Sequence, residues 1–128
     1  MTAIVVFAHG SSVESANEGV RRMSAEMAAR GGFPLVETAF LEMGKPDLPG
    51  AVACMCAGGA KHILVVPFFL TLGIHLRRDL PGIVDELLRI HTGITIEVTD
   101  PLEGHPALVD VMVGRAKDAL GKQTGQAR

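Results

Sequence analysis

The chain alternates short, strongly apolar runs with segments in which apolar residues recur every three or four positions, and this alternation constrains the fold most. Four apolar runs begin at Ala3, Pro34, His62 and Gly93. The first and third are nearly continuous in Val, Ile, Leu and Phe, which is typical of strands buried on both faces. Helical spacing between the runs predicts the order β-α-β-α-β-α-β-α. Right-handed crossovers then give a three-layer α/β/α fold with a four-stranded parallel sheet.

The apolar pattern also predicts the order of the strands. The first and third runs suit the centre of the sheet, whereas Glu37 and Glu97 interrupt the other two runs, as is typical of strands nearer an edge. The predicted strand order is therefore 2-1-3-4. We expect a single domain over residues 1–120, followed by a flexible polar tail over residues 121–128.

The helical segments carry start signals. Ser11 and Ser12 are candidate N-caps of the first helix. Proline is favourable in a first helical turn, so the third helix is expected to begin after Asp79 with Pro81 in that turn. This interpretation places residues 71–79 in a loop. The fourth helix follows Pro106 and has one apolar face, formed by Leu108, Val109, Met112, Val113, Ala116 and Leu120.

Composition excludes several classes of function. A formal net charge of -2 and the absence of Trp and Tyr argue against a nucleic-acid partner. The first apolar run, residues 3–8, is too short to cross a membrane, and no basic segment precedes it. Cys54 and Cys56 are expected to be reduced, buried thiols on a helix. These features predict a cytoplasmic protein with no membrane partner.

Two histidines fall in segments where a sheet of this order binds ligands. Ligands collect beyond the carboxyl ends of parallel strands, where the strand order reverses. The segment that begins at His9 and the segment that contains His75 both lie there. Paired imidazoles hold a divalent metal or move protons near neutral pH. The alternatives are a strand-end hydrogen bond for His9 and a water-facing loop position for His75.

Four segments of the sequence resemble a known family. The segments are "VVFAHGSS", "AFLEMGKPDL", "ILVVPFFLTLGIHLRRDLP" and "PLEGHPALVDVM". In this order they resemble the small sirohydrochlorin cobaltochelatases, which are class II chelatases that insert a divalent metal into a tetrapyrrole. The resemblance spans roughly residues 3–120. It implies that the two metal-handling histidines are His9 and His75, and that the family's glutamate is Glu42.

The resemblance further implies the reaction. A lyase of this kind inserts Co2+, or alternatively Ni2+ or Fe2+, into sirohydrochlorin during cobalamin or siroheme-type biosynthesis. His9 and His75 then bind the metal, and a histidine or Glu42 accepts the pyrrole protons. The metal is a substrate, so no tightly bound cofactor is expected. For His105, both a catalytic role and a structural role at a helix start are open.

The substrate that the resemblance implies carries many carboxylates, which need positive charge or free N–H groups. Arg77 and Arg78 are candidates, together with the backbone N–H groups near Ser11 and Ser12. An apolar wall for the flat macrocycle is expected from Leu72, Ile74 and Leu76.

The resemblance implies a homodimer, because the chain is about half as long as the two-lobed class II enzymes. One alternative function is a non-catalytic tetrapyrrole-binding or metal-binding protein of the same fold. A histidine phosphatase is a weaker alternative, because the R-H-G motif of that family would need an arginine where this chain has Ala8.

Overall fold

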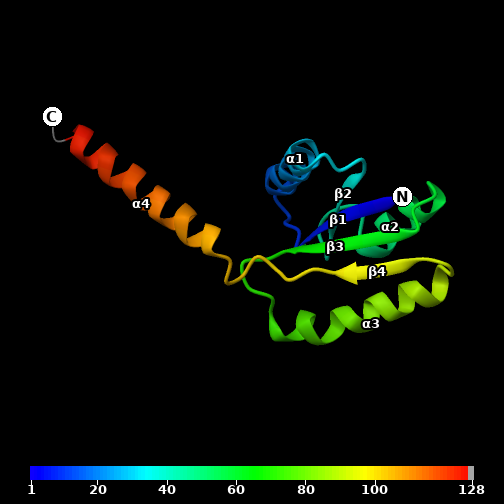
Figure 1. Cartoon of the computed structure of the whole chain (residues 1–128). Helices are drawn as coiled ribbons and strands as arrows, with labels where there is room; N and C mark the ends of the chain where they lie inside the picture. The colour runs from blue at the N-terminus through cyan, green and yellow to red at the C-terminus, as the bar shows by residue number, and fades with distance from the viewer. Residues whose placement is uncertain (127–128) are drawn as a thin grey trace.

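The structure, a computed structural model, describes residues 1–126, with side chains as far as residue 122. Over these residues, four strands alternate with four helices, and all strand pairs are parallel (Figure 1). The sheet order is β2-β1-β3-β4, so the predicted fold class and strand order are confirmed. The strands are β1 (Thr2–Ala8), β2 (Val36–Phe40), β3 (His62–Phe68) and β4 (Thr95–Val98). The helices are α1 (Glu14–Gly31), α2 (Leu48–Ala57), α3 (Ile74–Ile90) and α4 (Pro106–Gln126).

The main core lies between one face of the sheet and the helices α2 and α3. Val5 and Phe7 of β1 point to this face, and Ile63 and Val65 of β3 lie beside them. Val52 of α2 is fully buried against them. Alternation of side chains along each strand puts these odd-numbered residues on one face. Further members of this core are Ala3, Ala39, Leu48, Ala51, Met55, Leu80, Val84 and Leu87.

The opposite face of the sheet is covered by α1 over β2 and β1. Thr38 of β2 donates a hydrogen bond to Ser24 Oγ of α1 at 2.7 Å, and both side chains are buried. The predicted serine caps are wrong, because Val13 occupies the N-cap position and makes no side-chain cap bond. The Ser11 hydroxyl instead accepts a bond from the Val13 N–H, which closes the turn before the helix.

The third helix begins earlier than the sequence predicts. Its first turn forms at Ile74, where the Arg77 N–H bonds to the Gly73 carbonyl at 2.9 Å, and Pro81 lies inside the helix. The predicted loop over residues 71–79 is therefore mostly helical. Proline removes one backbone bond, but the apolar stripe of α3 continues past it and keeps both halves on the core. This stripe includes Leu76, Leu80, Val84 and Leu87.

The last helix departs from the expectation that helices cover the sheet. α4 extends away from the domain in Figure 1. It continues to Gln126, beyond the boundary predicted at residue 120, so residues 121–126 are helical rather than a separate tail. Residues 127–128 of the predicted tail lie outside the described residues.

The two cysteines agree with the prediction only in part. Both cysteines lie on α2 and are free thiols, as predicted, but Cys54 is exposed and Cys56 is half-buried. They were expected to be buried; α2 turns its buried side, which includes Val52 and Met55, toward the sheet.

Within the described residues, no helix has both the length and the apolar character needed to cross a bilayer.

Candidate functional site

The two predicted histidines line one cleft at the carboxyl rim of the sheet. The cleft has a volume of about 340 Å³, and both His9 and His75 contribute to its walls. His9 follows β1 directly, whereas His75 lies in the first turn of α3, which follows β3. Neighbouring strands of a parallel sheet thus bring residues far apart in sequence to one rim. The rest of the wall is formed by Leu41, Phe69, Thr71, Gly73, Leu76, Asp79 and Ile83.

His9 is oriented by three contacts. Its Nδ1 lies 3.3 Å from the Gly10 carbonyl oxygen, which can only accept a hydrogen bond. The neutral tautomer that donates from Nδ1 to Gly10 leaves the Nε2 lone pair free on the side of Glu42. Nε2 lies 3.6 Å from Glu42 Oε1. The Phe69 ring packs edge-to-face on the imidazole, with the ring centroids 6.4 Å apart.

His75 has a hydrogen-bond donor as its partner. Its Nδ1 lies 3.3 Å from Nη2 of Arg78, and a guanidinium group only donates hydrogen bonds. The neutral His75 ring therefore accepts at Nδ1 and carries its proton on Nε2. Arg78 also contacts the Asp79 carboxylate, with Nε 3.3 Å from Oδ1. The two histidines of the cleft thus have different partners, acceptor oxygens beside His9 and a guanidinium donor beside His75.

The loop that carries His9 lies directly against the loop that carries Glu42. The Glu42 N–H donates to the His9 carbonyl at 3.1 Å. Gly10 has φ +93°, and a Cβ added there would lie 1.7 Å from the Glu42 carbonyl oxygen. Only glycine fits this close approach in the left-handed region of φ. Gly10 therefore allows the contact that places Glu42 beside His9.

Asn17, which the sequence analysis did not identify, holds the His9 loop and the Glu42 loop together. Its side chain is 1% exposed and lies in the first turns of α1. Oδ1 accepts from the Ser11 N–H at 2.9 Å, and Nδ2 donates to the carbonyls of Ser11 and Met43 at 2.9 Å each. A buried amide with these partners ties the His9 loop to the Glu42 loop.

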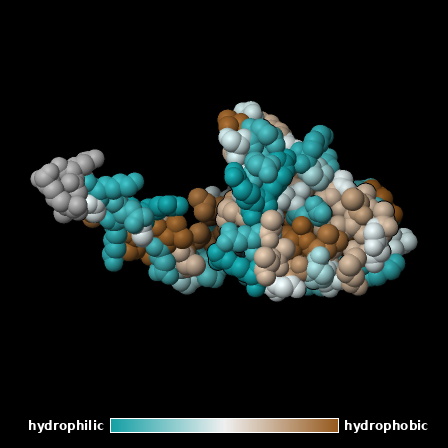
Figure 2. All heavy atoms as spheres, turned by 90° about the horizontal axis from the view of Figure 1, so that it is seen from above, coloured by the Kyte–Doolittle hydropathy of each residue, from teal (hydrophilic) through white to brown (hydrophobic). Residues whose placement is uncertain are grey.

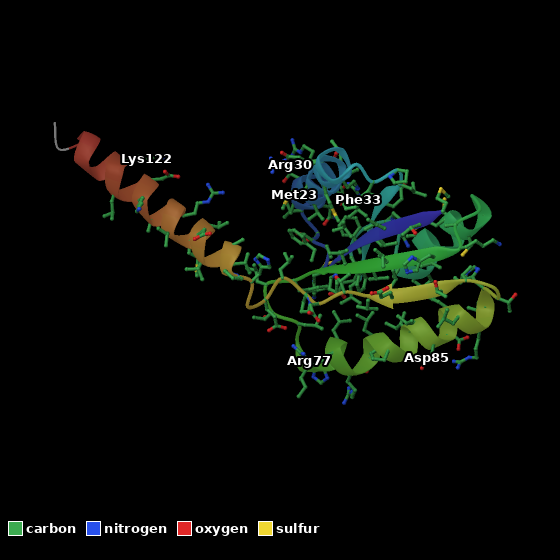
Figure 3. All side chains as sticks on the ribbon, viewed as in Figure 1. Met23, Arg30, Phe33, Arg77, Asp85 and Lys122 are labelled. Carbon is green, nitrogen blue, oxygen red and sulfur yellow. The ribbon has the colours of Figure 1, made fainter. Side chains whose placement is uncertain are left out.

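The predicted anion-binding residues differ in which of their hydrogen-bonding groups already have a partner. The Ser11 N–H donates to the Asn17 side chain of α1 and the Ser11 hydroxyl accepts from the Val13 N–H, whereas Ser12 is exposed. Arg77, labelled in Figure 3 at the start of α3, pairs with Glu103, with Nη2 2.7 Å from Oε1. Arg78 contacts the cleft residue His75. Among these four residues, Arg78 has the direct connection to the histidine pair.

The apolar wall is only partly the predicted one. Leu76 lines the cleft, but Ile74 is 79% exposed, and Leu72 is not among the lining residues. The helical start of α3 explains the exposure of Ile74, because Ile74 and Leu76 are two residues apart and therefore point about 200° apart around the helix. Leu41, Phe69 and Ile83, which the sequence analysis missed, supply the remaining apolar surface.

His105 takes the structural role that the sequence left open. Its Nδ1 accepts a hydrogen bond from the Ala107 N–H at 3.1 Å, and its carbonyl accepts from the Leu108 N–H at 3.0 Å. Both donors are in the first turn of α4, where backbone N–H groups lack helical partners. His105 therefore caps α4, and it is absent from the residues that line the cleft.

Among the described residues, the cleft lacks the closed ligand set of a structural metal site. Within the described part of the chain, no group of three or more His, Cys, Asp or Glu side chains is arranged to hold a metal ion. His9, with Glu42 nearby, and His75 leave coordination positions open for another ligand. Structural zinc sites instead close the metal with four protein ligands.

The open parallel sheet with paired histidines at its carboxyl rim defines a chelatase-like α/β domain. A comparison with known families identifies the family, because the CbiX family model matches residues 3–119. The chain belongs to the CbiX family.

Individual relatives agree with this assignment. The chain is 35% identical over 129 residues to a sirohydrochlorin cobaltochelatase of Saccharolobus solfataricus, covering 95% of this chain and 98% of that protein. It is 31% identical over 124 residues to a chloroplastic sirohydrochlorin ferrochelatase of Arabidopsis thaliana, covering 97% of this chain but 55% of that protein.

A solved structure supports the fold. The sirohydrochlorin chelatase SirB of Bacillus subtilis subspecies spizizenii, in complex with cobalt, is 27% identical with a TM-score of 0.84. The match covers 91% of this chain and 50% of that one. The chain thus spans about half the length of the plant and Bacillus relatives.

Proposed function

We propose that this protein inserts a divalent metal ion, Co2+ first, with Ni2+ or Fe2+ as alternatives, into sirohydrochlorin. It is a chelatase of the sirohydrochlorin cobaltochelatase type and acts in cobalamin or siroheme-type tetrapyrrole biosynthesis. The observation that carries this proposal is the single apolar cleft lined by both His9 and His75. Membership of the CbiX family and the chelatase names of the relatives support it.

His9 is the primary group for receiving the metal. When Nδ1 donates to the Gly10 carbonyl, the Nε2 lone pair is available, and Glu42 Oε1 lies 3.6 Å from Nε2. Imidazole binds Co2+, Ni2+ and Fe2+, and it lacks the tight hold of a set of thiolates. The carboxylate of Glu42 adds negative charge beside the ion. The pair holds a partly hydrated metal that can still leave.

Insertion also requires two pyrrole N–H protons to leave the macrocycle as two metal–nitrogen bonds form. His75 becomes a proton acceptor, or a second metal ligand, when its Nδ1 is released from Arg78. A carboxylate of sirohydrochlorin that draws Arg78 away makes this release depend on substrate binding. Arg78 is therefore a positioning residue that links docking of the macrocycle to the state of His75.

The shape of the surface around the cleft suits a large, flat ligand. A neighbouring groove of about 540 Å³ runs along α3 and shares Asp79 and Ile83 with the cleft. Leu87 and Pro49 extend its apolar lining. A tetrapyrrole presents broad apolar faces and acidic edges, so it suits an apolar floor with Arg78 at the rim.

The test is the rate at which metal-free sirohydrochlorin absorption is lost after Co2+ is added. With both His9 and His75 changed to alanine, we expect the rate to fall about 100-fold or more, the scale of lost general acid–base and metal-binding groups. His91→Ala, at the far end of α3, is the control and should keep the wild-type rate. An unchanged rate in the double variant would refute the site.

The same assay separates an enzyme from a binding protein. Catalytic turnover consumes many equivalents of sirohydrochlorin, whereas a non-catalytic tetrapyrrole-binding protein gives a change that stops at one equivalent. Repeating the assay with Ni2+ and Fe2+ identifies the preferred metal. The Arg78→Lys variant keeps the charge but loses the planar fork of donors, and we expect it to raise KM more than it lowers kcat.

A further inference from the structure

The loop over residues 41–46, which carries Glu42, depends on α1 for its conformation. Met43 in this loop has φ +55°, a left-handed conformation that residues other than glycine rarely adopt. Contacts from outside the loop must therefore stabilise it. Asn17 of α1 supplies one of them through its bond to the Met43 carbonyl at 2.9 Å. The part of the loop that follows Met43 is contacted by a different residue of α1.

That residue is Arg21, which lies about one helical turn after Asn17. Its Nη2 donates to the Lys45 carbonyl at 3.3 Å, and its Cζ lies over the Phe40 ring, 5.1 Å from the centroid. The face of an aromatic ring attracts a cation. Phe40 is 0% exposed, and a Cβ added at Gly44 would lie 2.8 Å from Cγ and Cδ2 of the same ring. Arg21 therefore contacts both the loop and the ring on which the loop rests.

Two carboxylates of α1 fix the guanidinium group of Arg21. Nη1 lies 2.6 Å from Glu14 Oε1 and 3.0 Å from Glu18 Oε2. Because both contacts use Nη1, Nη2 is left for the Lys45 carbonyl. α1 forms the upper layer in Figure 1, and Figure 2 views the molecule from that side, where the outer surface of this helix is largely hydrophilic. The Arg21 side chain is 31% exposed, so it lies at the border between this polar surface and the loop.

We propose that Arg21 is a positioning residue for metal insertion, which holds the loop over residues 41–46 so that the Glu42 carboxylate stays beside His9 Nε2. This inference rests on the proposed function. The Glu42 N–H bonds the His9 carbonyl, which fixes where the loop begins. The direction of a side chain depends on the backbone on both sides of its Cα, and Arg21 fixes the following part of the loop through Lys45. Residues that orient a metal ligand in this way affect metal binding without touching the metal.

The place of Arg21 predicts that its loss affects the two substrates differently. Arg21 is not among the residues that line the cleft or the groove along α3. A macrocycle bound over the cleft and the groove therefore has no direct contact with it. Loss of a residue that orients a metal-binding group typically costs about 10- to 100-fold in metal affinity or activity. We expect Arg21→Ala to raise the KM for Co2+ about 10-fold and to leave the KM for sirohydrochlorin within about twofold.

The first experiment is a double-mutant cycle between Arg21→Ala and Glu42→Gln, measured as kcat/KM for Co2+. If Arg21 acts through Glu42, its substitution costs about 10-fold in the wild-type background and nothing further in Glu42→Gln. Arg22→Ala is the matched control, because Arg22 is the next residue of α1 and is exposed, and it should keep the wild-type value. Equal losses from Arg21→Ala in both backgrounds, an equal loss in Arg22→Ala, or an equal rise in both KM values overturns the proposal.

The second experiment measures the loop independently of activity. Amide hydrogen exchange is followed at Glu42, whose N–H bonds the His9 carbonyl, and at Thr95, whose N–H bonds the Lys61 carbonyl at the amino edge of the sheet. We expect Arg21→Ala to speed exchange severalfold at Glu42 and to leave exchange at Thr95 unchanged, because only the loop is loosened. Unchanged exchange at Glu42, or equal acceleration at both amides, contradicts the positioning role.

The proposed function and the role of Arg21 fail in different ways. A wild type that inserts no metal refutes the proposed function. A wild type that inserts metal, together with an Arg21→Ala variant of unchanged kinetics, refutes only the role of Arg21.

Discussion

Replacing Asn17 by alanine tests how the two loops of the site are held together. The change removes a 3.3 Å bond to the exposed Glu14 carboxylate and three hydrogen bonds to the loop backbone, one from the Ser11 N–H and one to each of the carbonyls of Ser11 and Met43. Each such bond contributes about 1 kcal/mol net, so we expect a loss of about 3 kcal/mol in the free energy of unfolding. Because Asn17 is 1% exposed, water does not replace these bonds freely.

The assay is urea unfolding combined with amide hydrogen exchange. For a slope of about 1.5 kcal/mol per molar urea, the loss lowers the midpoint by about 2 M. The Ser11 amide should exchange much faster in Asn17→Ala. Ser24→Ala is the matched control, since Ser24 is also a buried polar residue of α1 but bonds Val20 and Thr38 instead of the loops. It should cost about 1 kcal/mol and leave Ser11 exchange unchanged. A loss under about 1 kcal/mol for Asn17→Ala, or unchanged Ser11 exchange, refutes the reasoning.

Two further predictions concern the same end of the molecule. Gly10→Ala should lower stability by at least about 2 kcal/mol and slow metal insertion, because its Cβ would meet the Glu42 carbonyl at a strained φ. Gly73→Ala, which has no atom near the added Cβ, should leave the melting temperature almost unchanged, and equal losses in both would contradict the argument. The bond from Arg21 lowers the pKa of Glu14 below 4.5, with a further bond from Asn17. The stabilisation from Glu14 is therefore present above pH 4.5 and lost as the pH falls through the lowered pKa, so urea midpoints of wild type and Glu14→Gln should differ at neutral pH and converge in acid.

The sequence alone was enough to predict the sheet. Continuous apolar runs distinguish β1 and β3, which form the centre, from strands interrupted by Glu37 and Glu97, because burial on two faces demands apolar side chains at successive positions. Once the order is known, the carboxyl ends of β1 and β3 are neighbours. The placement of His9 and His75 on one cleft follows from this topology and needs no knowledge of side-chain packing.

Local signals misled the prediction where tertiary contacts outweigh them. Pro81 resembles a helix start, but packing of Leu76 and Leu80 on the core extends α3 back to Ile74. This extension places His75 within reach of Arg78, three residues later on the helix. The contact between His75 and Arg78 is therefore a consequence of packing on the core.

The periodicity of apolar residues in the sequence determined the strands, their order and the rim of the sheet where the histidines meet. Only the tertiary structure decided the contacts that tune the site, such as the buried amide of Asn17 and the pairing of Glu103 with Arg77. These contacts join residues from separate elements, and no local pattern specifies the partner of a polar side chain. The course of α4 is also decided by the tertiary structure. An apolar stripe shows that a helix must be covered, but it does not identify the surface that covers it.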